Sequence, residues 1–109
     1  MSSFKSVYGT NGNDNLDYRG YHHKYAINGL NGNDTIYGSH KDDRLFGVDG
    51  NDFLYGEGGN DKVDGGYGND YLYGGHGNDK LFGGEGDDNL KGNSGEEYYD
   101  GGYGIDIVS

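Results

Sequence analysis

Aspartate side chains recur at a fixed spacing along the chain, and they are the residues best placed to do chemistry. From residue 34 onward the spacing is nine, and glutamate replaces aspartate once, at Glu97. A hard cation such as Ca²⁺ takes roughly six to eight oxygen ligands from carboxylates and peptide carbonyls. We therefore expect several metal ions to be bound by the side chains of Asp14, Asp34, Asp43, Asp52, Asp61, Asp70, Asp79, Asp88 and Asp106.

A glycine two residues before most of these aspartates indicates how the remaining oxygen ligands are supplied. Glycine adopts positive φ angles and allows close approach of one backbone to another, as tight turns require. Carbonyl groups in such turns can complete the ligand set of a hard cation. The backbone sites predicted in this way are Gly12, Gly32, Gly50, Gly59, Gly68, Gly77 and Gly86.

Each aspartate is the sixth residue of a nine-residue unit with the pattern G-G-x-G-x-D-x-U-x, in which U is a large apolar residue. Nine units run without a break over residues 29–109, and a tenth covers residues 9–17. Residues 1–8 form a lead-in, and the irregular stretch 18–28 separates the tenth unit from the others. A repeat at one fixed period predicts a single repetitive domain over residues 1–109.

Within each unit, we expect the first six residues to form a turn and the last three to form a short strand. One side chain of each strand then points inward. The inward positions hold Leu16, Ile36, Leu45, Leu54, Val63, Leu72, Leu81, Leu90, Tyr99 and Val108. One apolar residue in nine makes a thin core, and the 25 glycines and mean hydropathy of −1.00 are typical of disordered chains. Metal binding must therefore supply the stability that the burial of so few apolar side chains cannot.

The composition also excludes several classes of function. A net charge of −11 repels nucleic acid and anionic membrane surfaces. There is no cysteine, so neither a disulfide framework nor a thiolate metal site is available. No apolar run has the length of a membrane span or a signal peptide. We also find no HExxH motif and no nucleophile–base pair, so we expect no catalytic residues, no organic cofactor and no enzyme activity.

The ten units resemble the RTX (repeats-in-toxin) family, whose calcium-binding nonapeptide carries this pattern. The resemblance implies an all-β fold, a right-handed parallel β-roll or β-solenoid of about five coils. Each coil has 18 residues and is built from two nonapeptides. It places each Ca²⁺ between turns of successive coils, which allows up to about eight ions. The pattern is weakest at Lys41, where the fourth-place glycine is missing, and at Glu97. The stretch 18–28 lacks the turn pattern and is expected to bind no ion.

Folding on calcium binding follows from the charge of the turns, because repulsion keeps a metal-free chain open. The resemblance implies a secreted bacterial protein that folds in the extracellular medium and supports type I secretion of a larger protein. Two alternatives stay open. The chain is a self-associating structural subunit, such as a surface-layer, adhesin or virion component, or it is the non-catalytic module of a secreted enzyme. A cytosolic calcium buffer fits less well, because extracellular modules bind with a Kd of roughly 10⁻⁴–10⁻³ M.

The 18-residue coil predicts two outer faces that differ. We name the first the tyrosine face, formed by Tyr37, Phe53, Tyr55, Tyr71 and Tyr73. The second, the lysine face, carries Arg44, Lys62 and Lys80 with Phe46, Asp64, Phe82 and Asp100. The tyrosines either stabilise their sheet through cross-strand contacts or bind a carbohydrate, a protein or a second copy of the chain. The last repeat, which no further coil follows, is a second candidate for self-association.

Overall fold

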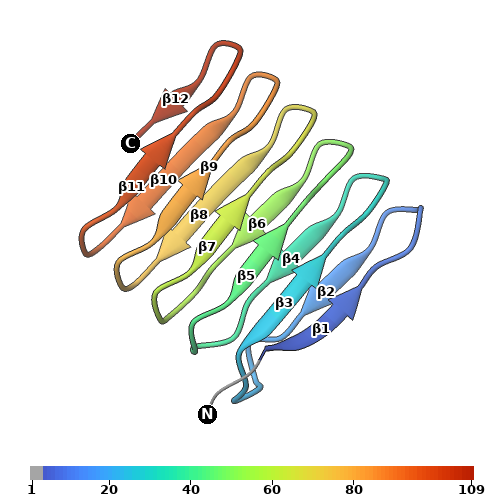
Figure 1. Ribbon diagram of the computed structural model, residues 1–109, viewed down its shortest axis with the longest axis vertical. Helices are drawn as coiled ribbons and strands as arrows, with labels where there is room; N and C mark the ends of the chain where they lie inside the picture. Colours follow the sequence, from blue (N-terminus) through green and yellow to red (C-terminus); the bar gives the residue numbers. More distant parts are fainter. Residues whose placement is uncertain (1–3) are drawn as a thin grey trace.

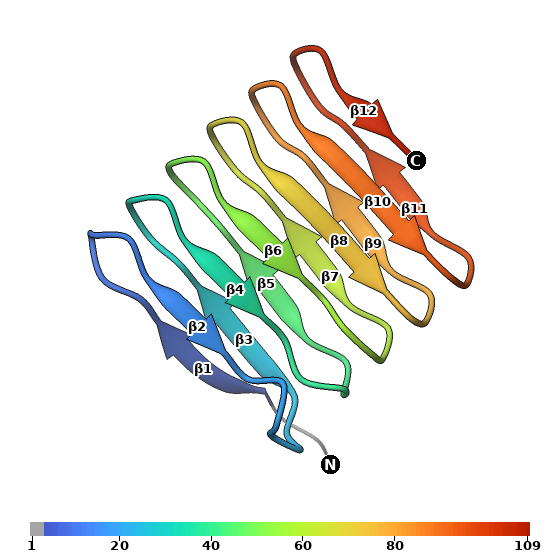
Figure 2. The same ribbon diagram turned by 180° about the vertical axis from the view of Figure 1, so that it is seen from behind.

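The computed structural model describes residues 4–109, which form two parallel sheets of six short strands each (Figure 1). Each turn carries the chain from one sheet to the other, so strands that are consecutive in the sequence lie in opposite sheets. The sheet at the front of Figure 1 contains β1 (Lys5–Tyr8), β3 (Tyr25–Asn28), β5 (Arg44–Phe46), β7 (Lys62–Asp64), β9 (Lys80–Phe82) and β11 (Tyr98–Asp100). The sheet at the front of Figure 2 contains β2 (Asn15–Asp17), β4 (Thr35–Tyr37), β6 (Phe53–Tyr55), β8 (Tyr71–Gly75), β10 (Asn89–Asn93) and β12 (Ile107–Val108).

The register of the strands confirms the predicted 18-residue coil. Leu54 pairs with Leu72, and Leu45 pairs with Val63, in two different sheets. Strand β2 pairs with β4 across the irregular stretch, so the repeat at residues 9–17 stacks on the repeat at residues 29–37. The predicted all-β parallel solenoid is therefore confirmed, and none of the described residues lies in a helix that could span a membrane.

The solenoid has about six turns, one more than the repeat pattern predicts. The additional strand, β1, lies in the lead-in and pairs with β3, with Val7 opposite Ile27. Among residues 5–8 only Val7 is half-buried, and the segment carries no glycine turn, so the repeat pattern gives no sign of this strand. Residues 1–3 of the predicted lead-in lie outside the described part of the chain.

A narrow file of mostly aliphatic side chains, contributed by both sheets, forms the core. The inward positions from Ile36 to Leu90 are at most 1% exposed, and Ile27 and Tyr25 extend the file into the irregular stretch. Three predicted inward residues near the ends are less buried. Leu16 and Tyr99 are partly covered, and Val108 is 47% exposed because β12 is the last strand of its sheet.

The fourth-place glycines allow the coils to approach closely. Gly68 has a φ of +102°, and a Cβ atom there would collide with the carbonyl oxygen of Gly50 in the preceding coil. We therefore expect Gly68→Ala to lower the free energy of unfolding by at least about 1–2 kcal/mol. Gly20→Ala is the control, since a Cβ atom at Gly20 would meet no atom within 4 Å. Equal stability of the two variants in urea denaturation would contradict this prediction.

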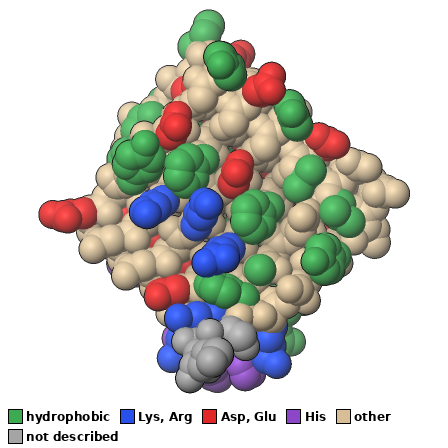
Figure 3. Space-filling model, viewed as in Figure 1, with side chains coloured by type: hydrophobic (Ala, Val, Ile, Leu, Met, Phe, Trp, Pro, Cys, Tyr) green, Lys and Arg blue, Asp and Glu red, His purple; other side chains and the backbone are tan. Residues whose placement is uncertain are grey.

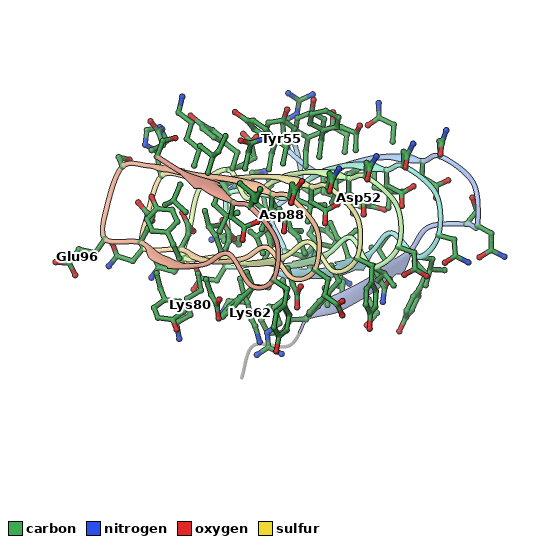
Figure 4. All side chains as sticks on the ribbon, turned by 90° about the horizontal axis from the view of Figure 1, so that it is seen from above. Asp52, Tyr55, Lys62, Lys80, Asp88 and Glu96 are labelled. Atoms are coloured by element: carbon green, nitrogen blue, oxygen red, sulfur yellow. The ribbon has the colours of Figure 1, made fainter. Side chains whose placement is uncertain are left out.

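The two outer faces have the predicted compositions. On the tyrosine face, the rings of Tyr37 and Tyr55 are stacked with centroids 4.8 Å apart, and those of Phe53 and Tyr71 are 5.8 Å apart. Basic, acidic and hydrophobic side chains mix on the opposite face (Figure 3). Figure 4 shows Tyr55 on one side of the two layers and Lys62 and Lys80 on the other, with Asp52 and Asp88 between the layers.

Candidate metal sites

The sixth-place residues form two rows along the two edges of the solenoid, one row leading into each sheet. The row that leads into the tyrosine-face sheet contains Asp14, Asp34, Asp52, Asp70, Asp88 and Asp106. The row that leads into the lysine-face sheet contains Asp43, Asp61, Asp79 and Glu97. The structure thus brings the aspartates predicted from the sequence together in two lines, each along one edge.

Within a row, one carboxylate oxygen of every sixth-place residue except Asp14 accepts a backbone hydrogen bond from the preceding coil. The backbone N–H of Asp52 donates to Oδ1 of Asp70 at 2.8 Å, and the N–H of Asp70 donates to Oδ1 of Asp88 at 2.8 Å. The other row repeats this contact, since the N–H of Asp61 donates to Oδ1 of Asp79 at 2.7 Å. Asp70, Asp79 and Asp88 therefore lie at fixed positions between two coils, and their second oxygens take no part in these bonds.

The second carboxylate oxygen is buried and has no hydrogen-bond partner in six of the described aspartates. These are the Oδ2 atoms of Asp34, Asp52, Asp61, Asp70, Asp79 and Asp88. Burying a carboxylate oxygen without a hydrogen-bond donor costs free energy, so each of these atoms needs another partner in the folded protein. Because the six recur at the same place of the repeat, the partner must recur with them.

In five of the six turns, a methyl group added to the first-place glycine would lie close both to this oxygen and to a carbonyl oxygen of the next coil. A methyl group on Gly47 would lie 2.5 Å from Oδ2 of Asp52 and 2.8 Å from the carbonyl oxygen of Gly65. A methyl group on Gly65 would likewise lie 2.6 Å from Oδ2 of Asp70 and 2.8 Å from the carbonyl oxygen of Gly83. The first-place glycine therefore leaves a space lined by oxygen atoms from two successive coils.

The donor set fits a hard cation. No three of the described His, Asp or Glu side chains converge on one point, so each space offers at most two carboxylates and otherwise backbone carbonyls. Carbonyl-rich sites of this kind suit Ca²⁺, which accepts backbone oxygens and irregular geometry. A transition metal would favour nitrogen or sulfur ligands, whereas the atoms that line these spaces are oxygens.

Burial changes the proton affinity of these carboxylates in the metal-free fold. Desolvation raises the pKa of Asp61 to about 10, and hydrogen bonding by the N–H of Asp43 only partly offsets it. Desolvation likewise raises the pKa of Asp70 to about 8 and that of Asp52 to about 7. An ionised form is thus unfavourable at these places without a cation.

A comparison with protein-family models matches the RTX calcium-binding nonapeptide repeat in four overlapping copies, at residues 26–54, 41–72, 55–90 and 73–108. The matched residues cover well over half of the chain and include most of both aspartate rows. The chain belongs to this family. RTX repeats bind calcium, in agreement with the oxygen-lined spaces between the coils. No curated protein and no solved structure matches the chain significantly.

Not all of the predicted site residues have the environment typical of an RTX turn. Asp106 is half-buried at the end of its row, and its Oδ1 accepts a hydrogen bond from the N–H of Asp88 at 2.9 Å. Glu97 takes the aspartate position and accepts from the N–H of Asp79 at 2.9 Å. Asp14 and Asp43 are bonded to hydroxyl residues of their own turns, Thr10 and Ser39, which the sequence reasoning did not single out. The sequence does contain a sign of these bonds, because in both turns a hydroxyl residue replaces the second-place glycine of the repeat pattern.

The predicted backbone sites share one conformation with one exception. Gly32, Gly50, Gly59, Gly68, Gly77 and Gly86 all have positive φ angles, whereas Gly12 does not. The irregular stretch has no sixth-place carboxylate, because Tyr25 is aligned with Asp43 there. The same stretch brings two histidines together, with Nδ1 of His22 lying 3.0 Å from Nε2 of His40.

Proposed function

We propose that this RTX chain is a structural module that folds when it binds Ca²⁺ in the extracellular medium and has no catalytic activity of its own. The observation that carries the proposal is the set of six buried Oδ2 atoms without a donor. A divalent cation would supply the missing partner and would join the two coils that line each space. We assign the ligands to these aspartates and to the carbonyl groups of the facing turns.

Charge and burial support the coupling of folding to calcium. The net charge of −11 is concentrated in turns that the fold packs against one another. Without a cation, folding must bury carboxylates that are ionised in the unfolded chain at neutral pH, and the apolar file is too thin to offset that cost. Binding energy is then folding energy, as in other small domains held together by metal ions.

Export before folding is consistent with the calcium levels of the two compartments. Extracellular calcium modules bind with a Kd of roughly 10⁻⁴–10⁻³ M, a concentration that cytosol does not reach. RTX repeats are typical of secreted bacterial proteins. The module would therefore stay unfolded inside the cell, which suits passage through a type I secretion channel, and would fold outside.

The tyrosine face supports a second role, contact with a carbohydrate, a protein or another copy of the chain. Phe53 is 48% exposed, and the rings of Tyr55 and Tyr73 lie 6.0 Å apart beside it. The guanidinium of Arg19 lies 4.1 Å from the centroid of Tyr37 and extends the aromatic surface by a cation–π contact. If the chain associates with a carbohydrate, a protein or another copy of itself in the presence of Ca²⁺, the double variant Tyr55→Ser/Tyr73→Ser should lose this association. Unchanged association of the double variant would exclude the role.

The metal assignment is tested by removing one carboxylate charge. Asp70→Asn should bind fewer Ca²⁺ ions per chain than the parent in equilibrium dialysis, because Oδ2 of Asp70 is one of the six atoms without a donor. Asp49→Asn is the matched control, since it removes the same charge from an exposed third-place residue. The control should bind as many ions as the parent. Equal ion counts in both variants would contradict the assignment.

A further inference from the structure

Two of the ten turns have a backbone conformation different from the rest. The φ angle of the second-place residue is positive in the other eight, even where that residue has a side chain. The eight residues are Leu30, Val48, Glu57, Gly66, Gly75, Gly84, Asn93 and Gly102. At Thr10 and Ser39, the second-place residues of the other two turns, the φ angle is not positive. We call the two exceptional turns, residues 9–14 and 38–43, the hydroxyl turns.

The different conformation turns a backbone N–H toward the carboxylate. The N–H of Thr10 donates to Oδ2 of Asp14 at 2.7 Å, and the N–H of Ser39 donates to Oδ2 of Asp43 at 2.7 Å. In a turn with positive φ the N–H points elsewhere, as when Gly66 donates to Oδ1 of Asp64 at 3.1 Å. The oxygen left without a donor in six other turns is therefore satisfied by the chain in both hydroxyl turns.

The hydroxyl group completes the closure in the same way in both turns. The oxygen of Thr10 accepts from the N–H of Gly12 at 3.1 Å, and the oxygen of Ser39 accepts from the N–H of Lys41 at 3.1 Å. The Thr10 hydroxyl also donates to Oδ1 of Asp14 at 2.9 Å. Serine or threonine at the second place can make these bonds, whereas glycine cannot.

The two hydroxyl turns occupy equivalent places in the fold. Asp14 is the first aspartate of the row that leads into the tyrosine-face sheet, and Asp43 is the first of the other row. Before Asp43 in its row stands Tyr25, which has no carboxylate and whose N–H donates to Oδ1 of Asp43 at 2.9 Å. Ser39 Oγ lies 2.8 Å from the carbonyl oxygen of His23, so this turn also contacts the irregular stretch.

We propose that the two hydroxyl turns bind no calcium and that each closes the N-terminal end of one row of calcium sites with donors of the chain itself. Thr10 and Ser39 are then the residues that decide where each row begins. The inference rests on the proposed function, because it assumes that the turns with a free Oδ2 bind Ca²⁺. The calcium-binding aspartates would be the six with that free oxygen, and Asp14 and Asp43 would have a purely structural role.

Ion counting in one row tests the proposal. Asp61→Asn should bind fewer Ca²⁺ ions per chain than the parent at saturation, whereas Asp43→Asn should bind the same number. Both variants replace a buried sixth-place aspartate of the same row by its neutral isostere. A loss of ions in Asp43→Asn equal to that in Asp61→Asn would overturn the proposal. A parent that binds no Ca²⁺ at all would instead overturn the proposed function, so the two failures are distinguishable.

A measurement on the parent chain covers the case in which Asp43→Asn does not fold. Crystals grown with Tb³⁺ in place of Ca²⁺ would give an anomalous difference map that locates each ion directly. We expect peaks beside Oδ2 of Asp61 and Asp79 and no peak beside Oδ2 of Asp43 or Asp14. A peak within coordination distance of either of the last two atoms would overturn the proposal.

Discussion

Metal-free protein should gain β structure when the pH is lowered from about 8 to about 5 without any added calcium. Burial raises the pKa of Asp52 to about 7, of Asp70 to about 8 and of Asp61 to about 10 in the metal-free fold, against 3.8 for an unperturbed aspartate. At a pH between these values the folded form binds more protons than the unfolded form. Acid therefore favours the fold, and the stabilisation is complete below pH 3.8 and is lost as the pH rises through the raised pKa values.

Far-UV circular dichroism of chelator-treated protein across this pH range measures the effect. Asparagine mimics a protonated carboxyl group, so a variant with Asp52, Asp61 and Asp70 all changed to Asn should keep more β structure at pH 8 than the parent and depend less on pH. A β signal of the parent that stays constant or falls on acidification would contradict the account of the buried carboxylates.

Shortening one core side chain should be as damaging as the loss of a metal site. Leu81 is completely buried in β9, and Leu81→Ala should lower the free energy of unfolding of the calcium-saturated protein by about 2–5 kcal/mol. The effect is large for this fold because the described core is a narrow file of mostly aliphatic side chains. Under the proposed coupling of folding to calcium binding, the variant should also need more Ca²⁺ to fold.

The neighbouring residue of the same strand provides the control. Lys80 is exposed in β9, so Lys80→Ala should change the free energy of unfolding by less than about 0.5 kcal/mol. Urea denaturation at saturating Ca²⁺ gives both values. Similar losses in Leu81→Ala and Lys80→Ala would show that the inward file is not the core of the folded protein.

The coil and both faces follow from the sequence because they depend on spacing alone. A nine-residue unit with one strand fixes which residues stack 18 apart, and the alternation of side chains along a strand separates Leu54 from Phe53 and Tyr55. The same spacing places the sixth-place aspartates in two rows. The coil, the two faces and the two aspartate rows were therefore predictable from the nine-residue period alone.

Features that depend on local contacts could not be predicted in this way. Strand β1 forms because the lead-in pairs with the irregular stretch, and neither segment carries the repeat. The closure of the turns at Thr10 and Ser39 depends on the orientation of one peptide group, which the residue types suggest but do not determine. The approach of His22 to His40 likewise depends on the path of an irregular segment.

The central claim is that calcium binding and folding are one event, and circular dichroism during a calcium titration tests it most directly. Chelator-treated protein at neutral pH is titrated with Ca²⁺, and with Mg²⁺ as the control, because Mg²⁺ requires a smaller and more regular octahedral site. We predict a cooperative change from coil to β structure with Ca²⁺ and none with Mg²⁺. A full β signal already present in chelator and indifferent to Ca²⁺ would contradict the claim.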